Sequence, residues 1–299
     1  MHGSIKHVGI IGAGELGQAL GRAFRRADVR VKFYDTQTER SEVGSVAELL
    51  HFSRTVFLCS PSWANRSIAE ELVRAAGSEQ CMVVCFSKGV EGGFVTMDRV
   101  LEAHLGGKHL YGLAYGPMIA EELAVGRQAS AVVALSDMSS YDRLSELLAK
   151  AKIVCEPSSD LQGLGIVGVL KNVYAIAFGM SDGLMLGANA KGKLVVMVLR
   201  EMKQLLLHFE ADPELAEGLA GLGDLVTTGI TDASFNYRVG KTIAQGIADE
   251  KIKSEGLNTL KELSHKVDAS AYPLLGVLDK IVHHHLPAGQ LDQLLSGKA

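Results

Sequence analysis

The sequence of 299 residues predicts an α/β protein with a doubly wound parallel sheet, followed by a second, all-helical domain. Strand-like and helix-like runs alternate from the amino terminus to Glu156, as they do in sheets built from βαβ units. Beyond the turn at Pro157–Asp160 the strand-like runs disappear and long helical patterns begin. Because a chain of this length exceeds most single cores, we expect two domains, an α/β domain at 1–157 and a helical domain at 158–299.

The first strand–turn–helix unit contains a glycine-rich loop, VGIIGAGELG at residues 8–17. Its glycines Gly12, Gly14 and Gly17 match the pattern G-x-G-x-x-G, which needs them for the turn, for close approach of a pyrophosphate and for packing of helix on strand. The free N–H groups and the positive dipole at the helix start favour phosphate there. We therefore expect residues 1–157 to form a Rossmann-type, dinucleotide-binding domain. The loop residues expected to contact the cofactor are Gly12, Gly14, Glu15, Leu16 and Gly17.

The second strand, Val29–Asp35, ends in a carboxylate. Asp35 lies close to the separation of about 20 residues from the glycine loop that is expected of an acid accepting the ribose hydroxyls. A carboxylate at this place repels a 2′-phosphate, so we expect NAD rather than NADP as the cofactor. The alternative interpretation is that Asp35 only caps a turn before Thr36.

Two further strands end in polar loops. Open α/β sheets bind ligands at the carboxyl ends of their strands, so Ser60 and Pro61, after the strand Thr55–Cys59, are expected to contact the cofactor. Lys88, after the next strand, is a candidate for substrate binding, although lysines at strand ends are often simply solvated. Trp63, the only tryptophan, has two interpretations: it covers a nicotinamide or adenine ring, or it is a packed core aromatic.

The remaining elements follow from periodicity and from turn residues. We expect strands at residues 81–86, 111–117, 129–135 and 153–156, and helices at residues 46–52, 69–76, 120–125 and 144–150. In the carboxyl-terminal half we expect helices at residues 161–178, 189–209, 258–266 and 274–284, with Ser159 or Asp160 as the first cap.

Two charged residues of the carboxyl-terminal half point to proton chemistry. Lys171 lies among apolar residues of the first long helix, where loss of solvation lowers the pKa of an amine toward values useful for proton transfer. Asp224 follows two glycines in GLAGLGDL. It is either the N-cap of a helix or a partner that orients the Lys171 amine and tunes its titration, and the spacing along the chain leaves both interpretations open.

Composition excludes several other classes. With 30 basic and 34 acidic residues and no basic tract long enough to follow a phosphate backbone, nucleic acid is not an expected partner. The amino terminus lacks a signal-peptide pattern and no uncharged apolar run reaches the length of a membrane span, so we expect a cytoplasmic protein without membrane insertion.

No metal site is expected. Cys59, Cys81, Cys85 and Cys155 show no C-x-x-C spacing and are interpreted as buried thiols, not as disulfides or zinc ligands. The adjacent histidines at 283–285 face three directions on a helix, which favours a solvated helix end over convergence on a metal ion.

The sequence resembles the bacterial NAD(P)-dependent glycerol-3-phosphate dehydrogenase family over nearly its whole length. The motifs GIIGAGELGQAL, CSPS, SKGVE, LKNVYAIAFGMSDGLMLGANAKG, GLAGLGDLVTT, NYRVG and SEGLNTLKEL occur in the family's order. The resemblance implies an oxidoreductase of glycerophospholipid metabolism that acts on a CH–OH group. Hydride passes between nicotinamide and the central carbon of a small anionic substrate, by default glycerol 3-phosphate or dihydroxyacetone phosphate. It also implies a homodimer formed through the helical half.

The resemblance assigns roles by position. Lys171 matches the family's catalytic lysine, which protonates the carbonyl oxygen as hydride arrives, and Asp224 matches its acidic partner. An alkoxide that develops during hydride transfer needs such a positioned proton donor. The other matches are Lys88, Asn172 and Thr228 with substrate contacts, Asn236 with the asparagine beside the phosphate-binding arginine, and Glu255 with a cofactor-side acid.

Two positions depart from the family pattern and make the pocket less polar. Phe235 replaces the arginine that clamps phosphate, and Met118 replaces a serine after Gly-Pro. Arg238 matches another basic position, and its reaching across to the phosphate is a conjecture. The first rival hypothesis is a dehydrogenase for another small phosphonate, a carboxylate or a less polar hydroxy compound. The second is a catalytically silent NAD(H)-binding protein, against which retention of Lys171 and Asp224 speaks.

Overall fold

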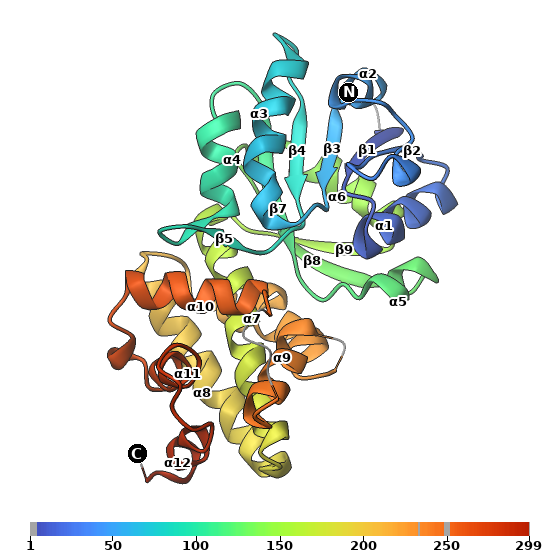
Figure 1. The fold of residues 1–299 in the computed structure, drawn as a ribbon. Coiled ribbons are helices and arrows are strands. Elements are labelled where there is room, and N and C mark those ends of the chain that lie inside the picture. Colours follow the sequence, from blue (N-terminus) through green and yellow to red (C-terminus); the bar gives the residue numbers. More distant parts are fainter. Residues whose placement is uncertain (1–4, 233, 248–251, 299) are drawn as a thin grey trace. The chain divides into compact units, whose positions relative to one another are not determined.

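The computed structural model describes residues 5–232, 234–247 and 252–298. These residues form two compact units. The first consists of the chain up to Lys88 together with Met97–Gly165, and the second consists of Gly89–Thr96 and the chain from Ile166 onward. Figure 1 shows the large sheet in the first unit and mostly helices in the second. The predicted fold class, an α/β sheet followed by an all-helical carboxyl-terminal region, is confirmed.

The first unit is built on a seven-stranded sheet in the order β2-β1-β3-β4-β7-β8-β9. Because β1 lies between β2 and β3, the chain reverses its progress across the sheet there, and a topological switch point lies between β1 and β3. The strands are β1 (His7–Ile11), β2 (Arg30–Tyr34), β3 (Thr55–Leu58), β4 (Met82–Cys85), β7 (Leu110–Tyr115), β8 (Ala129–Leu135) and β9 (Ile153–Pro157).

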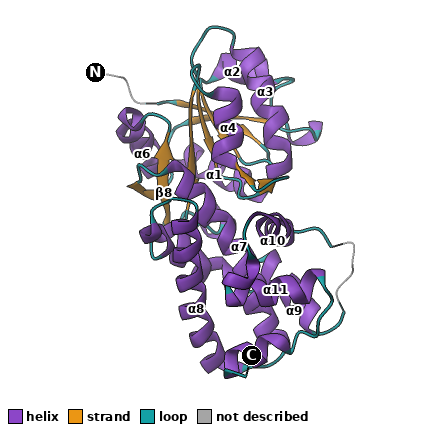
Figure 2. Ribbon diagram, turned by 90° about the vertical axis from the view of Figure 1, so that its left-hand side faces the viewer, coloured by secondary structure: helices purple, strands orange, loops and turns teal. Residues whose placement is uncertain are grey.

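Helices cover both faces of this sheet. Apolar residues of α1 and α6 share one core cluster with the strands, whereas Gly9 of β1 faces Leu49 of α2. Figure 2 shows α2, α3 and α4 grouped on one side of the strands and α6 on the other. The helices are α1 (Glu15–Arg26), α2 (Val46–Phe52), α3 (Asn65–Ala76), α4 (Met97–Leu105), α5 (Ala120–Ala124) and α6 (Tyr141–Lys150).

The sheet departs from the all-parallel expectation at one pair of strands. β7 and β8 run antiparallel, while the other neighbouring pairs are parallel. The connection from β7 to β8 spans residues 116–128 and contains only the five-residue helix α5, whereas parallel crossovers usually contain a longer helix that packs on the sheet. Helix α4 was not anticipated from the sequence either.

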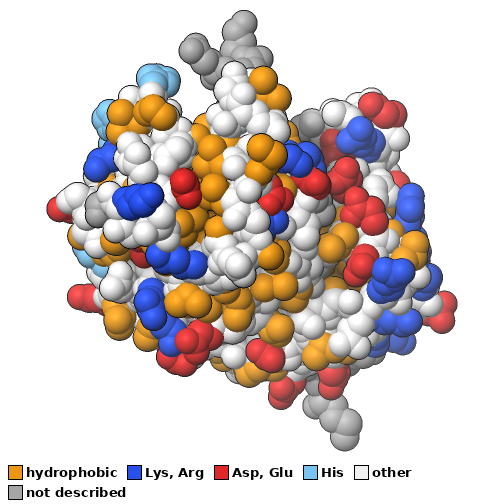
Figure 3. Space-filling model, turned by 90° about the horizontal axis from the view of Figure 1, so that it is seen from below, with side chains coloured by type: hydrophobic (Ala, Val, Ile, Leu, Met, Phe, Trp, Pro, Cys, Tyr) orange, Lys and Arg blue, Asp and Glu red, His pale blue; other side chains and the backbone are white. Residues whose placement is uncertain are grey.

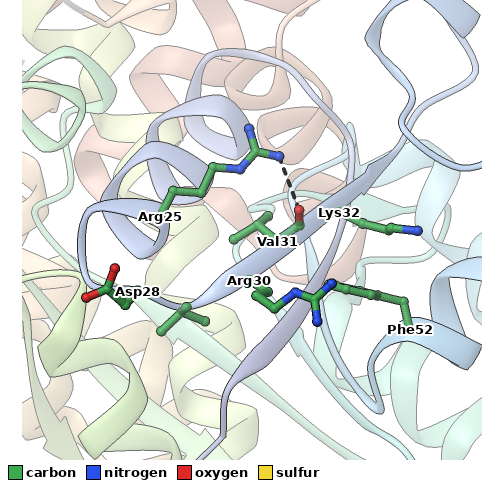
Figure 4. A pocket seen from close by; sticks show the side chains of 7 residues that line it. Arg25, Asp28, Arg30, Val31, Lys32 and Phe52 are labelled. Atoms are coloured by element: carbon green, nitrogen blue, oxygen red, sulfur yellow. Dashed lines mark hydrogen bonds between the residues drawn. The ribbon is translucent and has the colours of Figure 1, made fainter.

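The edge strand β2 is protected against pairing with another chain. The Arg25 guanidinium donates to the Val31 carbonyl (3.1 Å) and to the Glu42 carboxylate (2.7 Å), and Glu42 in turn accepts from the Phe33 N–H (3.3 Å). Figure 4 shows Arg25 and Val31 in the lining of a shallow hollow of about 400 Å³ beside this edge. The Val31 carbonyl and the Phe33 N–H of this edge are thus occupied within the protein. None of the predicted cofactor or substrate residues is among those that line this hollow.

The second unit contains long helices and a small hairpin. Asp160 caps the first of these helices, since its Oδ1 accepts from the Gly163 N–H at 2.7 Å. The elements are α7 (Leu161–Gly183), whose first residues belong to the first unit, α8 (Gly187–His208), α9 (Phe235–Ala244), α10 (Glu255–Lys266), α11 (Pro273–His283), α12 (Gln290–Ser296), β5 (Val90–Glu91) and β6 (Val95–Thr96). Helices α9 and α12 and the hairpin were not anticipated.

Helix α7 is strongly apolar because it is a core helix. Among the described helices it alone is long and apolar enough to cross a membrane, and the segment that passes this test is wholly buried in the protein. A buried carboxylate, Glu201 of α8, joins α7 to α11 by accepting from the Tyr174 hydroxyl (3.0 Å) and from the Leu275 N–H (3.0 Å). Burial raises the pKa of Glu201 despite these hydrogen bonds.

The four cysteines carry free thiols, of which Cys59 and Cys155 are only partly buried. Burial raises the pKa of Cys81 to about 11 and those of Cys85 and Cys155 to about 12, so these thiols are protonated at neutral pH. Within the described residues no three His, Cys, Asp or Glu side chains converge as metal ligands would.

On the face drawn in Figure 3, acidic and basic side chains are interspersed with apolar ones.

His109, just before β7, predicts a pH effect on stability. It is buried, and neither ring nitrogen has a hydrogen-bond partner among the described residues. Burial, with repulsion from Lys108 and Arg54, lowers its pKa below the ordinary 6.5. The unfolded chain therefore binds a proton before the folded one does, and stability falls as the pH drops below about 6.5 toward the folded pKa.

Replacement of this side chain is expected to remove that part of the acid sensitivity. Urea unfolding of the His109→Leu variant at pH 7 and pH 5 should show a smaller loss of unfolding free energy than the wild type shows. The exposed His51 offers a control, because His51→Leu should leave the pH dependence as it is. An unchanged pH dependence in His109→Leu would contradict this account.

Candidate active site

The glycine loop leaves open space at its middle glycine and close contacts at the other two. Gly12 has φ +95°, and a Cβ there would lie 2.5 Å from the Ser60 backbone nitrogen. A Cβ at Gly17 would lie 2.0 Å from the Gly12 carbonyl oxygen, whereas a Cβ at Gly14 would meet nothing within 4 Å. Gly14 is also the N-cap of α1 and supplies no side-chain cap, so the N–H groups at this helix start face the open space.

Asp35 is held against this loop by two backbone N–H groups. Its Oδ2 accepts from Ala13 (2.7 Å), and its Oδ1 accepts from Gln37 (2.9 Å). The carboxylate thus ties the end of β2 to the loop and also closes a local turn. Two hydrogen bonds leave further lone pairs of the carboxylate available to a ligand. Of the other predicted cofactor residues in this unit, Glu15 and Pro61 are exposed, Leu16 is partly buried and Ser60 is buried.

Hydrogen bonds connect the loops that follow β3 and β4. The Ser60 hydroxyl donates to Asn65 Oδ1 (2.7 Å), and the Ser87 hydroxyl donates to the Ser60 carbonyl. The Tyr115 hydroxyl donates to the Ser87 carbonyl (2.6 Å), and the Lys88 amine lies over the Tyr115 ring, 5.4 Å from its centroid. These contacts therefore join the loop at Ser60 to the loop at Ser87 and place the Lys88 amine against Tyr115 of the same network. Met118 packs against the core of the same unit.

The helical unit contains a buried cluster around Lys171. The Lys171 amine lies 3.4 Å from Asp224 Oδ2 and donates to Thr228 Oγ1 at 3.0 Å. Thr228 Oγ1 is also within 3.1 Å of Asp224 Oδ1. The side chains of Lys171 and Asp224 are only 8% and 2% exposed. Each charge is therefore compensated by the other and by hydrogen bonds, as buried charges require.

An unusual backbone conformation presents Asp224 to the lysine. The segments Leu219–Gly223 and Leu225–Gly229 wind as π-helical turns, which are rare and frequent at functional sites. Asp224 lies between them at the N-cap position of the second segment, makes no side-chain cap hydrogen bond there, and pairs its carboxylate with Lys171. A Cβ at Gly229 would lie 3.6 Å from Lys171 Cδ, so this segment packs along the lysine stem.

Helices α7 and α9 of this unit contact each other at two glycines. A Cβ at Gly179 of α7 would lie 1.9 Å from the Tyr237 carbonyl oxygen, and one at Gly240 of α9 would lie 2.0 Å from the Ile176 carbonyl oxygen. The two helices therefore cross backbone against backbone.

At the start of α10 this crossing brings Asn172 and Asn236 together. Asn236 Oδ1 accepts from the Gly256 N–H at 3.0 Å, and a Cβ at Gly256 would lie 2.5 Å from the Asn172 carbonyl oxygen. Glu255, the residue before, is the first residue of α10 and is partly buried.

The position that departs from the family pattern is accessible. Phe235 is the first residue of α9 and is 50% exposed. The Arg238 guanidinium lies over its ring, 5.6 Å from the centroid, and donates to the Asp232 carbonyl at 2.5 Å. Arg238 therefore places a positive charge beside the benzyl ring that occupies this position.

Three structural features of these loops and helices were not predicted from the sequence. Asn65 and Tyr115 support the loops after β3 and β4, yet each reads as an ordinary residue at the start of a helix or the end of a strand. The glycine contacts of α9 were also missed, although glycines at residues 179, 183 and 240 gave a signal for close helix packing.

A glycine loop at the first βα turn of a Rossmann-like sheet is typical of proteins that bind a dinucleotide. Residues 41–141 match the model of the NAD-dependent glycerol-3-phosphate dehydrogenase N-terminus, and residues 160–292 match that of its C-terminus. The chain belongs to this NAD-dependent glycerol-3-phosphate dehydrogenase family, as its motifs predicted, and it is an NAD(P)-dependent oxidoreductase.

Individual proteins agree with this assignment. The chain is 32% identical to glycerol-3-phosphate dehydrogenase [NAD(P)+] of Gloeobacter violaceus over 88% of its own length and 87% of that protein. It is 34% identical to the protein of the same name from Pseudomonas entomophila, over 80% and 72% of the two chains. The crystal structure of glycerol-3-phosphate dehydrogenase from Coxiella burnetii matches with a TM-score of 0.87 and 25% identity, covering 97% of this chain and 98% of that one.

The crossing of α7 and α9 can be tested by stability. Gly240→Ala places a methyl group against the Ile176 carbonyl and should destabilise the protein by about 2 kcal/mol or more, because the helices must separate. Gly192→Ala in α8 is the matched control. A Cβ there meets nothing within 4 Å, so it should stabilise by about 0.5–1 kcal/mol. Equal unfolding free energies for the two variants in urea would contradict the close crossing.

Proposed function

We propose that this protein interconverts glycerol 3-phosphate and dihydroxyacetone phosphate with NAD(H), using Lys171 as the proton donor and acceptor. The observation that carries the proposal is the buried pair of Lys171 and Asp224, 3.4 Å apart, in a chain of this family. Buried charges are costly, and they concentrate at sites where a proton or a charged ligand is handled. The 1–157 part would bind the dinucleotide, and the 158–299 part would supply the proton.

The described loop geometry fits a dinucleotide. The open space at Gly14 and the uncapped start of α1 would hold the pyrophosphate, with Glu15, Leu16 and the loops at Ser60 and Pro61 around it. When bound, NAD(P)H supplies the hydride that reduces the ketone carbon. We propose NAD as the preferred form, since Asp35 presents a carboxylate where a 2′-phosphate would be repelled. Glu255 is proposed as a further acid on the cofactor side.

The Lys171 amine is proposed to give a proton to the substrate oxygen during reduction and to take it back during oxidation. Asp224 stabilises the ammonium form and orients it, while Thr228 accepts a hydrogen bond from the same amine and fixes its direction. The cluster thus holds one proton on Lys171 Nζ, in buried surroundings.

The remaining residues supply hydrogen-bond donors for an anionic substrate. Asn236 uses its Oδ1 to accept from Gly256, which leaves its amide N–H groups as donors. We propose that these N–H groups, the Asn172 side chain and the Lys88 amine bind the substrate, with Thr228 close to the reacting oxygen. Cytoplasmic location and a homodimer through the helical half stay predictions from the sequence.

A second candidate substrate class is favoured by one observation. Phe235 is half exposed at the start of α9, where the family pattern has an arginine. A less polar hydroxy compound, a carboxylate or a phosphonate would suit a site beside this ring. Arg238, stacked on Phe235, is the cation on the same helix that could still serve a phosphate.

Removal of the Lys171 amine tests the proposed chemistry. Lys171→Ala should lower the rate of NADH oxidation with dihydroxyacetone phosphate by roughly 10²–10⁴-fold, the usual contribution of a general acid, while NADH still binds. Lys261→Ala, which changes an exposed lysine of α10, is the control and should keep full activity. Undiminished turnover in Lys171→Ala would refute the role of the lysine.

Cofactor preference is tested at Asp35 by a variant that keeps the shape of the side chain and removes its charge. Asp35→Asn retains an acceptor for the loop but removes the charge, so the ratio of kcat/KM for NADPH over NADH should rise by about tenfold or more. Asp35→Ala loses the anchor of the loop as well and should weaken both cofactors. A ratio that stays the same in Asp35→Asn would show that the carboxylate does not select the cofactor.

The choice of substrate is tested at Phe235. NADH oxidation is measured with a panel of phosphorylated, carboxylated and uncharged ketones. If a less polar compound is the true substrate, the wild type prefers it, and Phe235→Arg should raise kcat/KM for dihydroxyacetone phosphate by about tenfold through a bidentate contact. If glycerol 3-phosphate is the substrate, the wild type prefers the phosphate, Phe235→Arg brings no such gain, and Arg238→Ala weakens phosphate binding.

A further inference from the structure

Trp63 is exposed on a rigid part of the molecule. It lies in the short turn Ser62–Ala64 after β3, and it is 77% exposed although its neighbours Ser62 and Asn65 are only 3% and 0% exposed. Tryptophan is among the residues that bury most area, and it is usually largely buried in a soluble protein. The interpretation of Trp63 as a packed core aromatic is therefore wrong, and the exposed indole is a feature that the fold of the unit alone does not explain.

The backbone that carries the indole is fixed on both sides. Before it, the Ser60 hydroxyl donates to Asn65 Oδ1, and the Ser60 carbonyl accepts from Ser87. Within the turn, the Ala64 N–H donates to the Pro61 carbonyl at 3.0 Å. After it, Asn65 Nδ2 contacts the sulfur atoms of Cys85 (3.5 Å) and Met97 (3.3 Å). The exposure of Trp63 therefore belongs to an ordered turn, not to a loose loop.

This turn directly follows the segment that packs against the glycine loop. The Cys59 N–H donates to the Ile11 carbonyl at 2.8 Å, and a Cβ at Gly12 would lie 2.5 Å from the Ser60 nitrogen. In the sheet order, β1 and β3 are the strands on either side of the switch point, where doubly wound sheets bind their ligands. An aromatic surface is thus held three residues from Ser60, whose backbone nitrogen lies against Gly12 of the loop.

We propose that the indole of Trp63 is a stacking surface of the dinucleotide site and packs against a ring of bound NAD(P). The proposal rests on the cofactor binding proposed above and adds a residue that the glycine-loop pattern does not contain. An indole buries a large flat area at little cost in side-chain entropy, and stacking tolerates either the adenine or the nicotinamide ring. Stacking covers apolar surface that otherwise remains in water.

The single tryptophan makes the contact measurable, because all tryptophan emission of the chain comes from Trp63. The probes are NAD⁺, which does not absorb that emission, and ADP-ribose, which lacks the nicotinamide ring. Saturating NAD⁺ should quench the emission and reduce its quenching by acrylamide at least twofold. If ADP-ribose does the same, the adenine ring is the partner; if only NAD⁺ does, the nicotinamide ring is. Unchanged emission and acrylamide quenching at saturating NAD⁺ would overturn the proposal.

The affinity of Trp63 variants for NAD⁺ and NADH distinguishes stacking of the indole on a cofactor ring from mere proximity to the cofactor. Trp63→Ala should weaken NAD⁺ and NADH binding by roughly tenfold, while Trp63→Phe should stay within about threefold because it keeps a ring. Val125→Ala removes another exposed apolar side chain of the same unit and should bind as the wild type does. Thermal melting of each variant without cofactor reports whether folding is intact.

The outcomes distinguish this proposal from the proposed function. If the wild type binds neither NAD⁺ nor NADH by calorimetry, the dehydrogenase function itself fails. If the wild type binds and Trp63→Ala binds equally well, the function stands and the stacking role is overturned. The same holds if Trp63→Ala leaves affinity unchanged but shifts a dimer to a monomer in sedimentation, because the indole would then be an interface residue.

Discussion

The buried ion pair of Lys171 and Asp224 is the interaction on which the rest of the helical unit depends. An ammonium and a carboxylate that are less than a tenth exposed each lose several kcal/mol of solvation, which only close pairing and added hydrogen bonds offset. Asp224 can meet the lysine because the surrounding chain adopts π-helical turns, and Thr228 returns from the next turn to contact both partners. A local backbone irregularity thus lets the two buried charges pair closely.

Glycines create the site in both units by the same physical means. At Gly12 and Gly17 they let strand, loop and helix approach more closely than any side chain permits, and at Gly179 and Gly240 they do so for two helices. Of the three glycines in the loop, Gly14 is the one at which an added Cβ would meet nothing within 4 Å. The close contacts fix the position of backbone and side chains, whereas the open one leaves room for a ligand.

The sequence predicts the parts of the site that depend on local pattern. The glycine loop, the acid that ends β2 and the lysine in an apolar helix follow from spacing and periodicity, and motif resemblance added Asp224 and Asn236. Contacts between distant segments were beyond such reasoning. Asn65 and Tyr115 gain their roles from strand order, and the antiparallel pairing of β8 with β7 joins strands whose direction no local pattern specifies. Spacing also left the role of Asp224 open, because a cap and a buried partner occupy the same sequence position.

The most direct test of the central claim is a crystal structure of the protein with NADH and a ketone substrate or analogue bound. The account predicts the Lys171 amine within about 3.2 Å of the oxygen that becomes the alcohol, with the Asp224 carboxylate still beside the amine. A complex in which the amine lies in bulk water, or in which another side chain contacts that oxygen in its place, would contradict the account.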